Sequence, residues 1–438
     1  MISKARAKAT GEGAPEKAPT EAFVWTWLPG ATQPVVAGRL ARSGGQLIFN
    51  YGRSYLQRPS VTSLYEPELP LRAGSLPLPA SMPMPSAIRD AAPDAWGRRV
   101  IINRLLGMAG RHADPVDLDE LTYMLQSGSD RIGALDFQAS ASEYVAREPR
   151  EATLAELLDA ADLVQEGVKL TPGLDAALFH GSSIGGARPK ANITSGDTKY
   201  IAKFSAQGDL YSVVKAEFIA MRLAALAGIS TAPVHLARAA GKDVLLVARF
   251  DREWAEGAWT RRAMVSGLTL LGLDEMMARY ASYEDLAEII RHRFESPRAN
   301  LHELFARLMF NILCGNTDDH ARNHAAFWNG RNLTLTPAYD ICPQSRAGNE
   351  ASQAMLIEGE NRMSRIMSCV NGAAAFQLDS NGAMNIARAQ IKVILQNWQS
   401  VCDEAHLSEV DRGLLWRRQF LNPFAFEGAP AALLALVA

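Results

Sequence analysis

The segment GNTDDHARNHAAFWNGRNLTLTPAYDICP, residues 315–343, decides how this 438-residue chain is interpreted. It holds three aspartates, two histidines and four asparagines between two apolar runs. Neither helical nor strand periodicity accounts for so many polar side chains. Asp318 and Asn323 are separated by four residues, and the strand-like run NLTLTPAYD places Asp340 at its end. Carboxylate and amide oxygens of this kind suit Mg²⁺, which prefers hard oxygen ligands.

A second candidate site lies upstream, where a Ser/Gly-rich loop, SSIGGARPK, is flanked by β-type runs. The paired Gly185 and Gly186 allow a ligand to approach the backbone, whose free N–H groups suit phosphate oxygens. The strand KYIAKF follows with Lys203, and the next helical run carries Glu217. Taken singly, these features also fit a hairpin loop, an edge-strand lysine and a solvated helix glutamate.

A glycine loop, a strand lysine and a helix glutamate, in this order, are parts of the upper lobe of a protein kinase. There the lysine grips the nucleotide phosphates and the glutamate orients the lysine. The run VLLVARFDRE then matches the connection between the lobes. Backbone groups of Ala248, Arg249 and Phe250 would hold adenine there. Phe250 would pack against the base, or serve only as a core aromatic.

The opening segment supplies the remaining kinase groups. A kinase needs a carboxylate near the attacking hydroxyl, and an amide oxygen and a second carboxylate on Mg²⁺. The D-x-x-x-x-N spacing predicts Asp318 as the catalytic residue and Asn323 as a metal ligand, with Asp319 as a competitor for the first role. Asp340, at the end of the following strand, would supply the second metal ligand. Two alternative interpretations remain. The histidines could form a zinc site, although a third ligand at a familiar spacing is lacking, or the aspartates could be purely structural helix caps and turn formers.

Composition gives no support for several other classes of protein. A net charge of −2 and a pI near 6.5 give no global reason to expect nucleic-acid or membrane binding, although a local basic patch stays open. The four cysteines are scattered, so we expect no disulfide framework or zinc site, and a reducing cytoplasm. No apolar run approaches the roughly 18 residues of a membrane span, and the start lacks the apolar core of a signal peptide.

The distribution of residue types along the chain predicts four regions. Residues 1–21 form a disordered tail, and residues 22–110 form a β-rich unit with strands at FVWTW, VVAGRLARS and QLIFNYG. A proline-rich connector and the helix APDAWGRRVIINRLLGMAG complete that unit. Residues 111–255 combine connecting helices with an upper kinase lobe, and residues 256–438 form a mainly helical lower lobe.

At this level of detail the chain resembles the HipA family of serine/threonine kinases, toxins of bacterial type II toxin–antitoxin modules. The similar segments include SSIGGARPK, FDR, GNTDDHARNH and AYDICP, with APDAWGRR and IGAL nearer the start. The resemblance covers nearly the whole chain. It implies an α+β fold: a two-lobed, protein-kinase-like fold with an added N-terminal β-rich subdomain and a mainly helical C-terminal lobe.

The resemblance also implies specific roles for residues. Asp318 takes the catalytic position, Lys203 the ATP lysine and Asp340 the second metal position. Ser183, with Ser182 as the alternative, takes the position of an autophosphorylated serine that switches the enzyme off. The other residues expected at ATP are those of the phosphate loop, the lobe connection and the catalytic segment: Gly185, Gly186, Ala187, Arg188, Pro189, Lys190, Ala248, Arg249, Phe250, His320, Arg322, Asn323 and Tyr339.

By the same resemblance, the cofactors are ATP and Mg²⁺. The substrate is a protein, such as an aminoacyl-tRNA synthetase or another translation factor, whose phosphorylation arrests growth. A separate helix-turn-helix antitoxin would provide any contact with DNA, and no membrane is involved. Ala248, Arg188 and Pro189 depart from the family pattern, which predicts altered nucleotide binding. A degenerate kinase fold acting as a binding module, or a kinase of a small molecule, remain the alternatives.

Overall fold

The computed structural model describes residues 18–106, 118–147, 152–178, 186, 188–206, 208–209, 211–346 and 348–438. Residues 1–17 of the tail predicted over residues 1–21, and the last four residues of the predicted helix APDAWGRRVIINRLLGMAG, therefore lie outside the described residues. Within the described ranges, no helix combines the length and apolar character that crossing a membrane requires.

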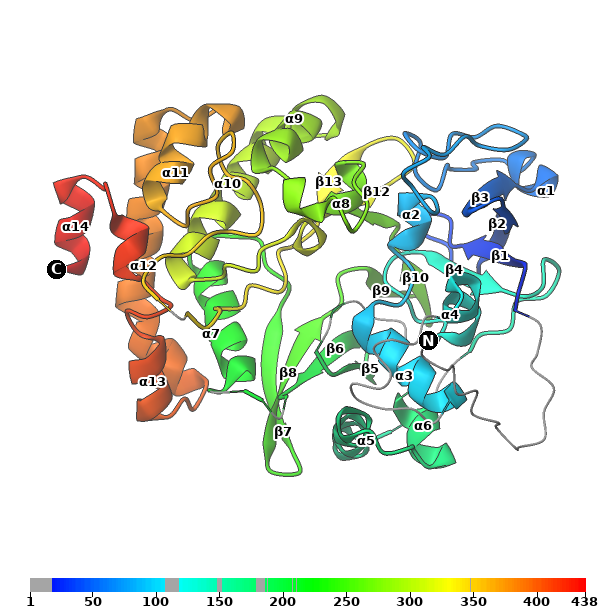
Figure 1. The fold of residues 1–438 in the computed structure, drawn as a ribbon, viewed down its shortest axis with the longest axis horizontal. Helices are drawn as coiled ribbons and strands as arrows, with labels where there is room; N and C mark the ends of the chain where they lie inside the picture. The colour runs from blue at the N-terminus through cyan, green and yellow to red at the C-terminus, as the bar shows by residue number, and fades with distance from the viewer. Residues whose placement is uncertain are drawn as a thin grey trace, which may run out of the picture.

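The N-terminal region is built on a four-stranded antiparallel sheet with the order β3-β2-β1-β4 (Figure 1). Its strands are β1 (Glu21–Thr26), β2 (Val35–Ser43), β3 (Gln46–Tyr51) and β4 (Leu135–Gln138). Alternate residues of β3 are buried, as expected where one face of a sheet covers a core. The three strands predicted first are confirmed. Because β4 pairs with β1, this sheet extends past the boundary predicted at residue 110.

Short helices surround this sheet and connect it to the rest of the molecule. They are α1 (Arg53–Leu56), α2 (Ser86–Arg89), α3 (Ala95–Leu106) and α4 (Glu120–Gln126). The proline-rich connector before α2 has little regular structure, as predicted. Glu68 fixes the start of α2, because its carboxylate accepts hydrogen bonds from the Ser86 and Ala87 amides at 2.6 and 2.9 Å.

The central part of the chain holds a second antiparallel sheet of four strands, with the order β5-β6-β8-β7. Its strands are β5 (Lys190–Ser195), β6 (Thr198–Phe204), β7 (Val234–Ala239) and β8 (Lys242–Ala248), and its neighbouring helices are α5 (Leu154–Glu166), α6 (Pro172–Leu178) and α7 (Val213–Leu226). A capping box at Thr153 and Glu156 starts α5, and Gly167 ends it in the left-handed conformation.

Two small β elements follow the central sheet. The hairpin of β9 (Arg252–Ala255) and β10 (Ala258–Arg261) precedes a three-stranded sheet of β11 (Met264–Ser266), β12 (Ala325–Trp328) and β13 (Leu333–Leu335). The strand predicted over NLTLTPAYD is therefore shorter than expected. Pro337 has no N–H to continue a ladder, and Ala338 forms instead an isolated parallel bridge with Thr231.

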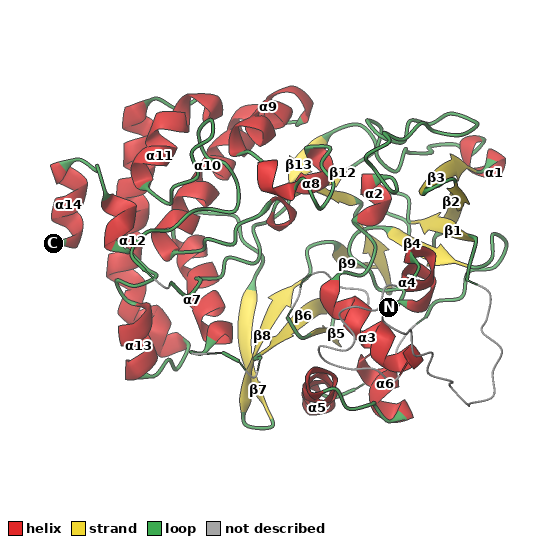
Figure 2. Cartoon of the chain, in the orientation of Figure 1, coloured by secondary structure: helices red, strands yellow, loops and turns green. Residues whose placement is uncertain are grey.

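The C-terminal part is mainly helical and contains the largest hydrophobic core (Figure 2). Its helices are α8 (Gly267–Leu270), α9 (Tyr283–Arg293), α10 (Pro297–Cys314), α11 (Ile366–Asn371), α12 (Ser380–Glu404), α13 (Glu409–Leu415) and α14 (Ala431–Val437), with short 3-10 turns including η3 (Ala278–Tyr280), η4 (Ala321–Asn323), η5 (Gly372–Phe376) and η6 (Pro423–Phe426). Helix α10 is buried along most of its second half and packs against α9, α11 and α12. The predicted fold class, α+β with a β-rich start and a helical end, is confirmed.

Candidate functional site

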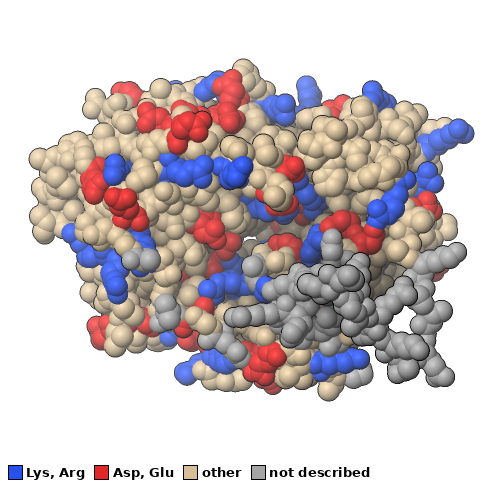
Figure 3. Space-filling view, viewed as in Figure 1, with Lys and Arg blue, Asp and Glu red and all other residues tan. Residues whose placement is uncertain are grey.

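A cavity of about 1000 Å³ lies where the N-terminal region, the central sheet and the helical part meet. On the face shown in Figure 3, acidic and basic residues lie next to one another around the middle of the molecule. The cavity is lined by most of the predicted site residues: Gly186, Arg188, Lys190, Lys203, Glu217, Ala248, Arg249, Phe250, Asp318, His320, Arg322, Asn323, Tyr339 and Asp340. Gly185, Ala187, Ser182 and Ser183 lie outside the described residues. Pro189 is described, and its carbonyl accepts the Phe204 amide at 3.0 Å.

Lys203 connects three separate segments of the chain in this cavity. It lies on β6, opposite Lys190 of β5 and Leu245 of β8. Its Nζ atom is 2.5 Å from Glu217 Oε1 on α7 and 2.5 Å from Asp340 Oδ1 after β13. Burial would lower the pKa of Lys203, but the two carboxylates outweigh this effect and raise it, so the ammonium stays charged.

The two partners of Lys203 respond differently to burial. Burial raises the pKa of Glu217, which is 4% exposed, and Lys203 counteracts only part of that effect. Burial also opposes ionisation of Asp340, but Lys203 and Lys190 outweigh it and hold the pKa of Asp340 well below its usual range. Asp340 is therefore a permanent negative charge at the edge of the cavity, where a cation could be held.

The backbone places Asp340 in an uncommon conformation. Its φ is 59°, in the left-handed region that aspartate enters more readily than most residues. The residues before it are fixed, because the Ala338 amide donates to the Ser230 carbonyl at 2.7 Å and the Ala338 carbonyl accepts from the Ala232 amide at 2.9 Å. This parallel bridge holds the segment against the loop between α7 and β7, and the Asp340 carboxylate meets Lys203 two residues later.

The segment after α10 carries the other acidic groups. Gly315 ends α10 with a φ of 75°, and a Cβ atom there would lie 2.7 Å from the Gln419 carbonyl oxygen. Only glycine fits such a position without a shift of the neighbouring backbone. At the other end of the segment, the Gly267 amide donates to the His324 carbonyl at 2.6 Å. The loop that holds Asp318 is therefore anchored at both ends.

The neighbouring aspartates Asp318 and Asp319 have different surroundings. Asp319 is 2% exposed and accepts hydrogen bonds from the Tyr283 hydroxyl and from Asn311 Nδ2 at 2.7 Å. His324 Nε2 lies 3.1 Å from the same carboxylate oxygen. Asp318 instead lines the cavity and is exposed. Its position in the cavity is compatible with the role predicted for it, whereas Asp319 is committed to internal packing.

The electrostatics of Asp318 suit proton transfer. Partial burial raises the pKa of its carboxyl, nearby Asp340 adds to that rise, and His320 opposes it. A carboxylate with a raised pKa is a better proton acceptor than one with an ordinary pKa. Asn323 lies beside it, and its side-chain N–H donates to the Asp318 carbonyl at 3.2 Å. The Asn323 side-chain oxygen accepts no hydrogen bond within the part of the chain that the structure describes, so it can act as a ligand.

Arg322 and Tyr339 complete the polar rim. The Tyr339 hydroxyl donates to the Arg322 carbonyl at 2.7 Å, and the Arg322 guanidinium pairs with Glu275, on the segment that follows α8. Arg188 pairs with Asp209 through two hydrogen bonds of 2.9 and 3.1 Å. Both arginines line the cavity and already have acidic partners, so an anionic ligand would have to compete with Glu275 or Asp209.

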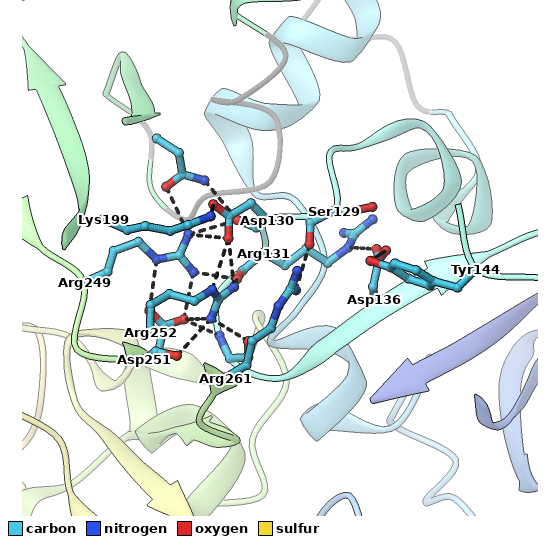
Figure 4. Close-up of polar contacts among 12 residues, drawn as sticks. Ser129, Asp130, Arg131, Asp136, Tyr144, Lys199, Arg249, Asp251, Arg252 and Arg261 are labelled. Carbon is cyan, nitrogen blue, oxygen red and sulfur yellow. Dashed lines mark hydrogen bonds and ion pairs between the residues drawn. The ribbon is translucent and has the colours of Figure 1, made fainter. Parts of the chain in front are cut away.

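The predicted lobe connection lies beside a buried ionic network (Figure 4). The Arg249 guanidinium is bound by Asp251 at 2.8 and 3.0 Å and lies 3.1 Å from Asp130. Asp130 also pairs with Lys199 and Arg252. Because its side chain is committed to this network and its amide donates to the Lys199 carbonyl at 2.8 Å, Arg249 would contact a nucleotide through its backbone carbonyl. Residues 130 and 131 are thereby attached to the connection.

Aromatic rings close the same end of the cavity. Phe250 lies 5.9 Å from Phe327 and 5.6 Å from Tyr339 between ring centroids. Ala248 and Val247 contribute small apolar surface beside them. A flat heterocycle would find aromatic and aliphatic surface here, next to backbone groups of the connection. The two readings of Phe250, base contact and core aromatic, are both compatible with this position.

The structure brings oxygen donors together where the sequence placed the metal. Asp318, Asn323 and Asp340 line one cavity, and Asn316 beside them has a buried side-chain oxygen without a hydrogen-bond partner among the described residues. Carboxylate and amide oxygens are the ligands that Mg²⁺ takes in nucleotide sites. The residues present therefore fit a magnesium ion bound together with nucleotide phosphates.

The sequence analysis missed a contribution from the N-terminal region. Asp94, just before α3, lines the cavity and accepts a hydrogen bond from the Gly186 amide. Trp96 binds the same loop, because its backbone amide donates to the Gly186 carbonyl at 3.2 Å and its indole to the Lys190 carbonyl at 3.0 Å. The motif APDAWGRR contains both residues, but nothing in its spacing indicates that it folds back onto the glycine loop.

Comparisons with protein families match both the N-terminal and the C-terminal part of the chain to the same family. The family model of the HipA N-terminal domain matches residues 31–138, and that of the HipA-like C-terminal domain matches residues 182–399. A Sinorhizobium fredii protein, provisionally named kinase Y4mE, is 26% identical over 294 residues, which cover 61% of this chain and 68% of that protein. The serine/threonine-protein kinase toxin HipA of Shewanella oneidensis is 26% identical over 186 residues, which cover 36% and 42%.

A solved structure extends the similarity to nearly the whole chain. The complex of HipA, HipB and operator DNA from Shewanella oneidensis matches with a TM-score of 0.67 and 19% identity. The match covers 95% of this chain and 96% of that one. At this identity the match shows a shared fold, and it agrees with the N-terminal sheet, the central sheet and the helical C-terminal part described above.

Proposed function

The chain belongs to the HipA family of kinases, and from this premise we propose that it is an ATP- and Mg²⁺-dependent protein serine/threonine kinase. The observation that carries the proposal is the position of Lys203, whose Nζ atom is 2.5 Å from both Glu217 and Asp340. Asp318 and Asn323 line the same cavity. Five groups from distant parts of the chain thus meet in the arrangement that phosphoryl transfer needs.

Each residue has a distinct part in this proposal. Lys203, oriented by Glu217, binds nucleotide phosphates. Backbone groups of the connection at Ala248 hold adenine beside Phe250. A bound Mg²⁺, held by Asn323 and Asp340, would neutralise phosphate charge.

The transfer step follows from the position of Asp318. Its carboxylate accepts the proton of the substrate hydroxyl, while the hydroxyl oxygen forms a bond to the γ-phosphorus. The bond between that phosphorus and the bridging oxygen breaks, and ADP leaves with the electron pair. The raised pKa of Asp318 supports this role, because the proton is then held more readily.

We further propose that the kinase acts as a toxin in the cytoplasm, arrests growth by phosphorylating a translation-related protein, and is held by a helix-turn-helix antitoxin. The support is family membership, together with relatives whose names describe a HipA toxin and a complex with HipB and operator DNA. Induced expression of the wild-type chain and of Asp318→Asn, followed by phosphoproteomics, tests this. Phosphoserine or phosphothreonine sites on translation proteins in the wild-type strain alone would support it, and identical phosphoproteomes would refute it.

Autophosphorylation is a separate part of the proposal. A phosphate on Ser183, or on Ser182, would add about −1.5 to −2 charges beside the loop that must receive nucleotide phosphates. We expect Ser183→Asp to lower ATP affinity without unfolding the chain. Peptide mass spectrometry decides whether the phosphate forms: it should be present on the wild-type protein and absent from Asp318→Asn. Equal modification of both proteins would refute autophosphorylation as the switch.

A further inference from the structure

The N-terminal region contributes a charged side chain to the nucleotide cavity. Asp94 lies at the start of α3, yet its carboxylate accepts the Gly186 amide of the glycine loop. Its second oxygen, Oδ1, is buried and has no hydrogen-bond partner among the described residues. Such an oxygen is costly to leave unpaired, so its retention at this place calls for a function.

The groups around Asp94 are those expected to receive phosphate. Asp94, Gly186, Lys190 and Arg322 line the same cavity, and Lys190 and Arg322 both act electrostatically on the Asp94 carboxyl. Gly186 has a φ of 103°, and a Cβ atom at this position would collide with Lys190 Nζ. The Gly186 amide donates to the Asp94 carboxylate, Lys190 and Arg322 favour its charged form, and Arg322 is also paired with Glu275. Free backbone amides and cations of this kind suit a phosphate, and in the free protein the Asp94 carboxyl group is bonded to the amide.

We propose that Asp94 is a positioning residue of the kinase: it holds the glycine loop through the Gly186 amide and occupies the place that a nucleotide phosphate takes on binding. This inference rests on the proposed function. The nucleotide must then displace the carboxylate from Gly186, so the N-terminal region opposes binding of the phosphates. Trp96 would still hold the loop after this displacement. Its two hydrogen bonds use the carbonyl oxygens of Gly186 and Lys190 and leave the Gly186 amide free to change partner.

The electrostatics of Asp94 support this assignment. Burial raises the pKa of Asp94 to about 7, although Lys190 and Arg322 favour the charged form. Keeping a negative charge here is therefore unfavourable, and a phosphate group brought beside it would add repulsion between like charges. A protein whose Asp94 is replaced by the uncharged, isosteric asparagine should lack this repulsion but keep an acceptor for the Gly186 amide.

The test measures binding of a non-hydrolysable ATP analogue and of adenosine to the intact chain by calorimetry, in the presence of Mg²⁺. We expect Asp94→Asn to bind the analogue about 10-fold more tightly, as removal of one like charge near a partly buried phosphate predicts. Adenosine has no phosphate, so its affinity should stay within about twofold. Glu68→Gln is the matched control, because it removes a partly buried carboxylate that also accepts backbone amides but lies outside the cavity lining.

Three outcomes are decisive. Unchanged or weaker binding of the analogue by Asp94→Asn would overturn this inference and leave the proposed kinase function standing. An equal gain for adenosine would also overturn it, because a general loosening of the structure would then explain the effect. If neither protein bound the analogue, the proposed function would fail and this inference with it.

Hydrogen exchange in the free protein tests the loop contact without nucleotide. In Asp94→Ala the Gly186 amide loses its acceptor, so a peptide that contains Gly186 should exchange faster than in the wild type. In Asp94→Asn its exchange should be unchanged. Unchanged exchange in Asp94→Ala would overturn the proposed hold of Asp94 on the loop.

Discussion

Replacing Asp319 by alanine should lower the free energy of unfolding far more than replacing Asp318 by alanine. The Asp319 carboxylate accepts from the Tyr283 hydroxyl and from Asn311 Nδ2 and lies 3.1 Å from His324 Nε2, all in a buried setting. A buried group left without its partner costs about 1–3 kcal/mol. With three such partners, and some relaxation of the surrounding side chains, the free energy of unfolding should fall by about 3–5 kcal/mol. This is a large share of the roughly 5–15 kcal/mol that stabilises a typical protein.

The assay is urea denaturation of both variants and of the wild type, followed by tryptophan fluorescence. Asp318→Ala is the matched control: its carboxylate is exposed, so we expect a change in unfolding free energy within about 0.5 kcal/mol. Activity should show the reverse order, because Asp318→Ala removes the proposed proton acceptor and keeps the fold. The reasoning is refuted if Asp319→Ala unfolds at the wild-type urea concentration, or if Asp318→Ala is the less stable of the two.

Three further substitutions test separate parts of the structure. Lys203→Met removes the cation shared by two carboxylates, so nucleotide affinity measured by calorimetry should fall about 10-fold to 100-fold; unchanged affinity would contradict its role. Gly315→Ala should destabilise the chain by about 1–3 kcal/mol in thermal or urea unfolding, because its φ is 75° and its Cβ would lie 2.7 Å from the Gln419 carbonyl oxygen. Gly413→Ala, where a Cβ meets no atom within 4 Å, is its control and should be close to neutral. Arg249→Met leaves buried carboxylates without their cation, so it should cost about 3–5 kcal/mol and speed limited proteolysis near residue 130; wild-type resistance would contradict the structural role of the network.

Local spacing predicted much of the candidate site. Asp318 and Asn323 are close in the chain, so their separation alone fits a loop that presents both to one ligand. Lys203 and Glu217 lie on a strand and the helix that follows it, and this order predicted the contact that the structure contains. The first pair could be predicted because only four residues separate its members. The second could be predicted because a strand followed directly by a helix connects its members.

Long-range packing could not be predicted in the same way. Asp94 and Gly186 are 92 residues apart, and their contact depends on how the N-terminal region docks onto the central sheet. The Asp130 and Arg131 carbonyls that accept from Arg249 are likewise more than 100 residues away in the chain, whereas its other partner Asp251 is a near neighbour. The choice between Asp318 and Asp319 was also ambiguous in the sequence, since only three-dimensional packing decides which neighbour faces the core.

The most direct test of the central claim is transfer of radiolabelled γ-phosphate from ATP to protein serine or threonine by the purified chain, with and without Mg²⁺. The wild type should transfer phosphate only with Mg²⁺, and Asp318→Asn should lower the rate by about 10²-fold to 10⁴-fold, as loss of a general base predicts, while calorimetry shows retained ATP binding. Equal transfer by the wild type and Asp318→Asn, or no transfer by a wild-type protein that binds ATP, would contradict the account.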